Sequence, residues 1–145
     1  PRFSTASLDF VISPDGRTVA FVGTDSAGRA RLMVRDLSRD NARPLPGTEG
    51  ASQPFWSPDS RALGFFASGK LLTLNLSTGA LETLCDASLP RGGAWGKGFI
   101  VLQPHSLGPL MKISERGGEI TAVTVVDSAA GESGHRFPCF LPDGR

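Results

Sequence analysis

Three aspartates occupy matching places in the sequence and have side chains that could serve acid–base or metal chemistry. Asp15, Asp59 and Asp143 each follow a proline and precede a small residue. In such a tight turn proline fixes φ, aspartate accepts hydrogen bonds from nearby backbone N–H groups, and glycine adopts a positive φ. Repetition of the same residue order along the chain is typical of turns with a structural role. We therefore interpret the following residues as structural: Pro14, Asp15, Gly16, Pro58, Asp59, Pro142, Asp143 and Gly144.

The two histidines, His105 and His135, are the other candidates for chemistry. Neither belongs to a His-x-x-x-His or Cys-x-x-Cys spacing, so the sequence predicts no metal site. It contains no Gly-x-Ser-x-Gly nucleophile elbow and no kinase motif, so it predicts no catalytic residue and no cofactor in this chain. His135 precedes a predicted strand, where it either bonds to a neighbouring structural unit or contacts a ligand.

Composition narrows the range of partners. The 15 basic and 14 acidic side chains give a formal net charge of +1, and the basic residues are scattered singly. A nucleic-acid surface needs clustered Lys and Arg, so we expect no nucleic-acid partner. No apolar stretch approaches the roughly 18 residues of a membrane-spanning helix, so we expect no membrane span. Cys85 and Cys139 are too few for a disulfide framework, and we expect free thiols.

The Pro-Asp turns belong to a repeat. Ser-Pro-Asp-Gly-Arg at 13–17 recurs as Ser-Pro-Asp-Ser-Arg at 57–61 and as Leu-Pro-Asp-Gly-Arg at 141–145. The prolines lie 44 and 84 residues apart, and since 84 is twice 42, a further copy is expected near residue 100. That copy is present but degraded. Trp95 lies 39 residues after Trp56, and the turn that follows it is shorter and has lost its Pro-Asp pair.

Each repeat contains four short apolar segments separated by turns. In the third segment of the first repeat, Leu32 and Val34 alternate with Arg31, Met33 and Arg35, which is typical of a strand with one buried face. Four antiparallel strands per repeat indicate a blade of a β-propeller. A β-sandwich is the competing architecture, but it does not require the same turn at a fixed period.

The sequence therefore predicts an all-β, partial β-propeller domain over residues 1–145. We expect blade 1 at 8–47, blade 2 at 54–85 and blade 3 at 93–124, and we expect 136–145 to begin a fourth blade whose first strand is 136–140. Trp56 and Trp95 should pack between blades. Closed propellers have about four to eight blades, so further blades of a parent chain or a second copy are needed to close the ring.

The repeat resembles the TolB-type, WD-like β-propeller family. The resemblance rests on residues 56–61 followed by an apolar strand ending in Phe, and on the segments 91–95, 114–119, 133–138 and 141–145 in that order. These later segments are similar to propellers fused to bacterial serine/threonine kinases or winged-helix regulators. The resemblance implies a sensor or scaffold region, with any catalytic domain outside these residues. Ser60 in place of the usual Gly and the degraded third turn depart from the family pattern.

Function is expected in the loops on one face of the propeller. The loops that enter each innermost strand, and those between second and third strands, should gather around the central channel: 25–29, 46–53, 85–92, 103–108 and 127–136. We expect this channel face to bind a protein or small ligand, because loops on a rigid scaffold commonly carry binding. Its candidate binding residues are Gln53, Arg91, His105, His135 and Arg136.

Two functional classes follow from these expectations. The first is a non-catalytic binding module that reports to an attached domain of a larger bacterial signalling protein. The second is the accessory propeller of an enzyme such as a propeller-fused serine peptidase. The chain opens on Pro1 without a signal-peptide pattern, and we expect it to be a piece of a longer protein whose compartment these ends do not fix.

Overall fold

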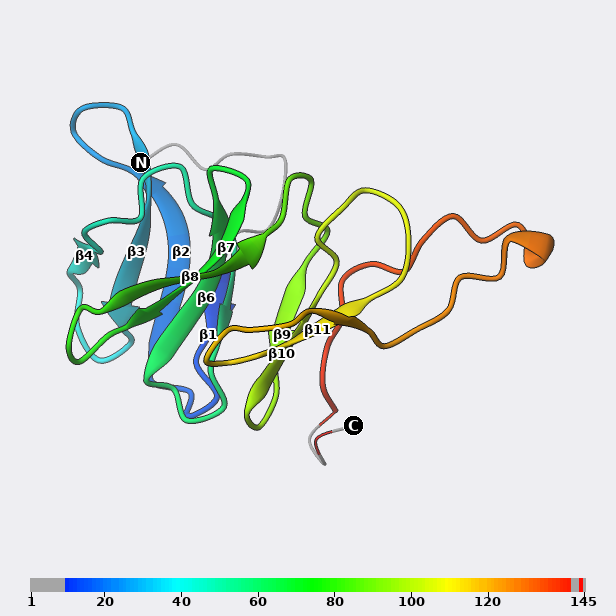
Figure 1. Ribbon diagram of the computed structural model, residues 1–145. Helices are drawn as coiled ribbons and strands as arrows, with labels where there is room; N and C mark the ends of the chain where they lie inside the picture. Colours follow the sequence, from blue (N-terminus) through cyan, green and yellow to red (C-terminus); the bar gives the residue numbers. More distant parts are fainter. Residues whose placement is uncertain (1–9, 142–143, 145) are drawn as a thin grey trace.

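Short apolar segments separated by tight turns form three four-stranded antiparallel sheets (Figure 1). The computed structural model describes residues 10–141 and residue 144. Within each sheet the strands follow one another in chain order. We call the sheets blade 1, blade 2 and blade 3. Their strands are β1 (Phe10–Ile12), β2 (Thr18–Thr24), β3 (Ala30–Asp36) and β4 (Ala42–Pro44); β5 (Ser52–Trp56), β6 (Ala62–Ala67), β7 (Lys70–Asn75) and β8 (Leu81–Asp86); and β9 (Gly93–Trp95), β10 (Phe99–Leu102), β11 (Met111–Ser114) and β12 (Thr121–Ala122).

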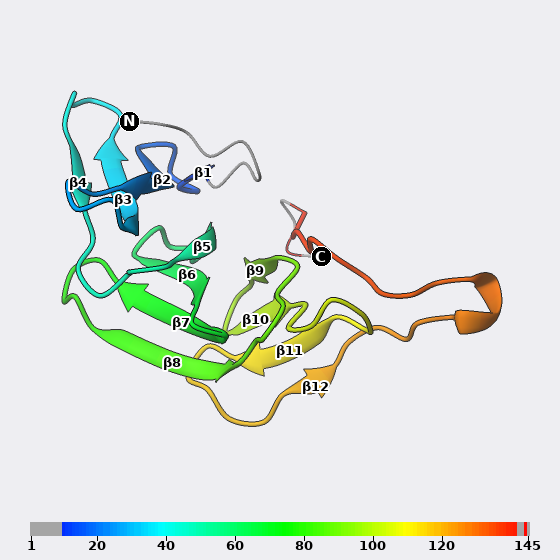
Figure 2. The same cartoon turned by 90° about the horizontal axis from the view of Figure 1, so that it is seen from above.

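The three blades are arranged side by side around a common centre, as the view from above shows (Figure 2). Strands β1, β5 and β9 are innermost, and each contacts the next. Strands β4, β8 and β12 lie at the outer edges of their sheets. This arrangement confirms the predicted all-β propeller. The strands fall within the predicted blades, except that β5 begins at Ser52 and β8 ends at Asp86.

Alternation along the strands builds one apolar core on each side of blade 2. Towards blade 1, Trp56, Leu63 and Phe65 pack with Leu32 and Val34, as the alternation in that strand predicts. The neighbouring positions point to the other side. There a second set of side chains packs between blades 2 and 3: Phe55, Phe66, Leu71, Ala87, Ile100, Leu102 and Ile113. Because both faces of blade 2 are covered, β6 has a continuous buried run from Leu63 to Phe66.

The Pro-Asp turns close the hairpins between first and second strands, as predicted for residues 14–16 and 58–59. In each, the serine before the proline donates its hydroxyl to the aspartate, and the carboxylate accepts from a backbone N–H two positions further on. Gly16 has φ +69° in this turn, and Ser60 adopts φ +61° at the same place. Pro142 and Asp143 lie outside the described residues, but the Gly144 N–H donates to Leu141 across 2.8 Å.

Residues 136–140 form no strand, contrary to the prediction for the start of a fourth blade. The segment lies beside blade 3, because the Phe137 N–H donates to the Arg91 carbonyl at 2.8 Å and the Phe140 ring packs on Phe99. Each observed innermost strand pairs with the second strand of its own blade. The described residues after 140 contain no such partner, and Phe137 has φ +52°, outside the strand region.

The chain also contains one short helical turn and two cysteines. Within the described residues the helical structure is η1 (Ser128–Ala130), a single 3-10 turn, so no helix there is long and apolar enough to cross a membrane. Figures 1 and 2 both show the segment around η1 extending away from the blades. Cys85, on β8, and Cys139 are free thiols, as expected.

Candidate binding site

Gln53 and Arg91 lie together at the junction of blades 2 and 3. The Gln53 side chain accepts a hydrogen bond from the Gly92 N–H at 2.7 Å and donates to the Pro90 carbonyl at 3.3 Å. The Arg91 guanidinium donates to the same carbonyl at 3.1 Å. Gln53 therefore holds the loop before β9 against blade 2, and Arg91 folds back onto that loop.

His105 is exposed at the outer side of the same junction. Its Nδ1 lies 3.2 Å from the Ser88 hydroxyl, and it lines a pocket of about 490 Å³ together with Gln103 and Cys85. Burial raises the pKa of the Cys85 thiol, which makes it a weak nucleophile at neutral pH. The nearby Asp86 carboxylate accepts a hydrogen bond from the Lys70 ammonium at 2.7 Å, which lowers the pKa of that carboxyl.

His135 is half-buried and held on both ring nitrogens. Its Nδ1 lies 2.7 Å from the Thr124 hydroxyl and its Nε2 lies 3.2 Å from a Glu132 oxygen. The Asp127 N–H and then His135 lower the pKa of the Glu132 carboxyl. These contacts fix the base of the segment around η1. Arg136 follows directly and is exposed, with no hydrogen bond or ion pair to another described residue.

Backbone hydrogen bonds join these loops into one layer. The Arg91 N–H donates to Gln103, the Phe137 N–H donates to Arg91, and the His135 N–H donates to Gly108. The Gln103 side chain, 1% exposed, donates to the Gly108 carbonyl at 2.8 Å. The structure thus brings Gln53 and Arg91 together, whereas His105 and His135 connect to them through the 103–108 loop. Gln103 was not predicted, although a glutamine directly after the apolar run 99–102 marks a polar group near the core.

The opposite end of the molecule, which we call the turn face, carries the Pro-Asp turns (Figure 1). Between blades 1 and 2 this face is closed by two contacts. The Ser60 hydroxyl accepts a hydrogen bond from the Asp15 N–H at 3.1 Å. The Trp56 indole donates to the Val11 carbonyl of blade 1 at 3.1 Å and is 7% exposed.

Between blades 2 and 3 the same face is open. Trp56 pairs with Leu63, seven positions further along, whereas Trp95 pairs with Ile100, five positions further along. The β9–β10 turn is therefore two residues shorter than its counterpart in blade 2. The turns of blades 2 and 3 make no hydrogen bond to each other in the described residues, and a pocket of about 550 Å³ lies between them.

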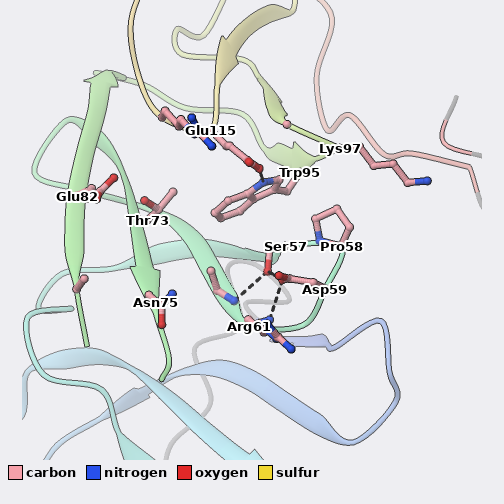
Figure 3. Close-up of a pocket in the computed structure, with 15 residues that line it drawn as sticks. Ser57, Pro58, Asp59, Arg61, Thr73, Asn75, Glu82, Trp95, Lys97 and Glu115 are labelled. Atoms are coloured by element: carbon pink, nitrogen blue, oxygen red, sulfur yellow. Dashed lines mark hydrogen bonds between the residues drawn. The ribbon is translucent and has the colours of Figure 1, made fainter. Parts of the chain in front are cut away.

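We call this pocket the blade 2–3 groove (Figure 3). The strand alternation that buries Leu71 also directs Thr73 and Asn75 towards blade 3. Glu115 directly follows β11, two positions after the buried Ile113, and lines the same groove. The side chains around the groove include Ser57, Asp59, Arg61, Thr73, Asn75, Glu82, Trp95, Lys97, Glu115 and Arg116.

The electrostatics of the groove are mixed. The Ser57 hydroxyl, followed by the Arg61 N–H, lowers the pKa of the Asp59 carboxyl, so this group is charged at neutral pH. The Trp95 indole donates a hydrogen bond to Glu115 of its own blade at 3.0 Å. Trp95 is half-buried. Carboxylates, cations, a hydroxyl and an aromatic surface in one groove suit binding of a polar ligand. The described residues contain no cluster of three or more metal-ligating side chains.

These geometries define a partial β-propeller of four-stranded antiparallel blades. In structure, the chain resembles TolB from Acinetobacter baumannii with a TM-score of 0.76 and 18% identity, over 94% of this chain and 35% of that one. It also resembles the β-propeller domain of the Trilobed protease from Pyrococcus furiosus, with a TM-score of 0.56 and 16% identity, over 72% of this chain and 38% of that one. At these identities the likeness establishes the fold.

In sequence, the chain is 28% identical over 147 residues to an uncharacterised peptidase, YuxL, of Bacillus subtilis. The match covers 92% of this chain and 20% of YuxL, so the chain spans about a fifth of the length of that relative. No protein-family model matches the chain.

Proposed function

We propose that the chain is a non-catalytic binding propeller within a larger protein, and that its channel face carries the binding. The observation that supports this is the loop layer built from residues 90–92, 103–108 and 133–137, held together by backbone hydrogen bonds of 2.8–3.1 Å. A layer fixed on packed blades can present exposed side chains such as His105 and Arg136 at little cost in conformational entropy.

A specific observation favours a peptidase as the larger protein. Similarity to YuxL covers 92% of this chain, and the propeller of a second protease has the same fold. The chain then acts as the accessory propeller of a peptidase and contacts polypeptide substrates before they reach a separate catalytic domain. Association with a kinase remains a prediction that none of these likenesses addresses.

The ring needs further blades in this proposal. On β1, Phe10 and Ile12 are 51% and 57% exposed, although both are large apolar residues in an innermost strand. In blades 2 and 3 the corresponding strands are covered by the preceding blade. A preceding blade of the parent chain, or of a second copy, can cover blade 1 in the same way.

Peptide hydrolysis by the full-length protein tests both statements. Two hydroxyls in the described residues contact an imidazole, Ser88 at His105 and Thr124 at His135. Ser88→Ala and Thr124→Ala must therefore each leave kcat unchanged if the propeller is non-catalytic. The double substitution His105→Ala with Arg136→Ala is expected to raise KM for long peptides at constant kcat. Arg17→Ala with Arg39→Ala, on exposed turns away from the channel face, is the matched control. Loss of kcat in Ser88→Ala or Thr124→Ala contradicts the non-catalytic assignment, and a KM effect confined to the control pair contradicts the assigned face.

A further inference from the structure

The two junctions between blades differ in what covers the backbone N–H of the turn aspartate. Between blades 1 and 2, the Asp15 N–H is covered by the Ser60 hydroxyl from the next turn along the chain. The equivalent N–H in blade 2 belongs to Asp59, because the two turns align residue by residue. The shortened β9–β10 turn supplies no hydroxyl to it among the described residues. The groove therefore lacks the turn that fills the first junction.

A buried threonine faces this groove with no partner for its hydroxyl. Thr73 is 7% exposed, lines the groove and makes no side-chain hydrogen bond to another described residue. Figure 3 shows Thr73 facing the space in front of Trp95. On this face of β7, Thr73 lies between Leu71, which belongs to the core between blades 2 and 3, and Asn75, which also lines the groove. The Thr73 hydroxyl is not one of the buried unpartnered atoms of the described residues, so it is accessible from the groove and free to bond to a ligand group there.

The charges at the rim are also available to a ligand. Arg61, Lys97 and Glu82 are exposed and form no ion pair with another described residue. Charges of both signs favour a peptide over a polyanion, whose phosphates would meet the carboxylates of the groove. The half-buried Trp95 indole adds an amphipathic surface of the kind that packs against peptide.

We propose that the blade 2–3 groove binds a short turn-forming peptide segment that carries a serine or threonine, in the place of the two residues missing from the β9–β10 turn. The hydroxyl of the segment accepts from the Asp59 N–H, as Ser60 does from Asp15 in the first junction. A polar group of its backbone pairs with the Thr73 hydroxyl. A volume of about 550 Å³ lies within the range of roughly 300–1,000 Å³ found for ligand sites.

The probe is a capped pentapeptide, acetyl-Ser-Pro-Asp-Ser-Arg-amide, which copies residues 57–61. It is added to the full-length protein labelled with ¹⁵N at tryptophan, and to the 145-residue chain labelled in the same way. This chain contains two tryptophans, whose indole N–H signals are distinguished by Trp95→Phe. We expect the peptide to shift the Trp95 signal and to leave the Trp56 signal in place, because Trp56 is buried against blade 1.

Three variants sharpen the test. Thr73→Val keeps the side-chain shape and removes the hydroxyl, so peptide affinity should fall about five- to tenfold, the value of one neutral hydrogen bond. Thr83→Val, on the opposite face of blade 2, is the matched control and should change nothing. Insertion of Pro-Asp between Gly96 and Lys97 restores the length of the turn, and it should abolish binding and leave Trp95 insensitive to the peptide.

The outcomes also separate the source of the segment. A shift in the full-length protein indicates a segment from a partner. A shift in the 145-residue chain alone indicates that the full-length polypeptide supplies the segment itself. The proposal is overturned if Trp95 shifts in neither protein, if acetyl-Ala-Pro-Asp-Ala-Arg-amide binds as tightly as the serine peptide, or if the insertion variant still binds. Channel-face variants leave these results unchanged, so failure here is distinct from failure of the channel-face proposal.

Discussion

Phe55 is held between two glycines, and this contact sets a measurable limit on the packing of blades 2 and 3. A Cβ added at Gly93 would lie 2.6 Å from Phe55 Cε1, and one at Gly64 would lie 2.3 Å from Phe55 Cε2. The ring also packs on Phe66 and Trp95, with centroid distances of 6.1 and 6.5 Å. Phe55 is 7% exposed, so it has no free side towards which to move.

Gly93→Ala should therefore destabilise the protein through overpacking. Forcing a methyl group into a packed core costs about 1–3 kcal/mol, and we take about 2 kcal/mol for this site. At about 3 °C per kcal/mol for a chain of this size, the melting temperature should fall by about 6 °C. In a Phe55→Leu background the branched side chain leaves room for the methyl group, so the added cost of Gly93→Ala should approach zero.

Gly23→Ala is the matched control for this cycle. Its Cβ would lie 2.7 Å from Met33 Cγ, nearly the same overlap, but the methionine is half-buried and flexible. The cost should stay below about 0.5 kcal/mol, because alanine is intrinsically better than glycine within a strand. Thermal and urea unfolding of the four cycle members and the control provide the measurement. Equal losses at Gly23 and Gly93, or a loss from Gly93→Ala that persists in the Phe55→Leu background, refute the argument that Phe55 is immobile.

Three further outcomes are expected. Hydrogen bonds, led by those from Ser13 and Ser57, lower the pKa values of Asp15 and Asp59 in the folded state. The stability that these carboxylates contribute is therefore present above their ordinary pKa and is lost as pH falls through the lowered folded values. The melting temperature should decrease below about pH 4, and it should decrease less steeply in the double variant Asp15→Asn with Asp59→Asn. Trp56→Phe should cost about 1–3 kcal/mol more than Trp95→Phe in urea unfolding, because it leaves the Val11 carbonyl without its donor inside a core. Maleimide labelling followed by mass spectrometry should modify exposed Cys139 before Cys85, whose thiol pKa is raised by burial; faster labelling of Cys85 contradicts the position of β8.

Much of the fold is predictable because its determinants are local. The Pro-Asp turns depend on residues within five positions of one another, and the strands on either side alternate between buried and exposed faces. Leu32 and Val34 follow this pattern, and the core between blades 1 and 2 forms where it predicts. The segment 136–140 has the composition of a strand, but a strand also needs a partner. Pairing is a non-local property that composition does not reveal.

The candidate sites were less accessible to sequence reasoning for the same reason. Arg91 is a loop residue, but Gln53 lies within β5, at a register shift where it adopts φ +49°, contrary to the prediction that it lies in a loop. The hydrogen bonds of both residues to residues 90 and 92 could not be predicted from a local sequence pattern. His135 is likewise tied to Thr124 and Glu132. Thr73 could have been noticed in the sequence, because it is a polar residue at an inward-facing position of β7, two places after Leu71. Its meaning depends on the neighbouring blade and so required the structure.

The blade 2–3 groove shows how a repeat can gain a site by losing a constraint. In the first junction, turn length, the Ser60 hydroxyl and the Trp56 indole all close one interface, and each supports the others. When the third turn is shortened by two residues, the turn–turn contact disappears, and the next tryptophan bonds to Glu115 of its own blade. The apolar core beneath remains intact, because Phe55, Ile100 and Ile113 are still buried. Stability thus resides in the core and the second strands, while the rim of the junction is free to change, and a ligand contact is most easily built at such a position.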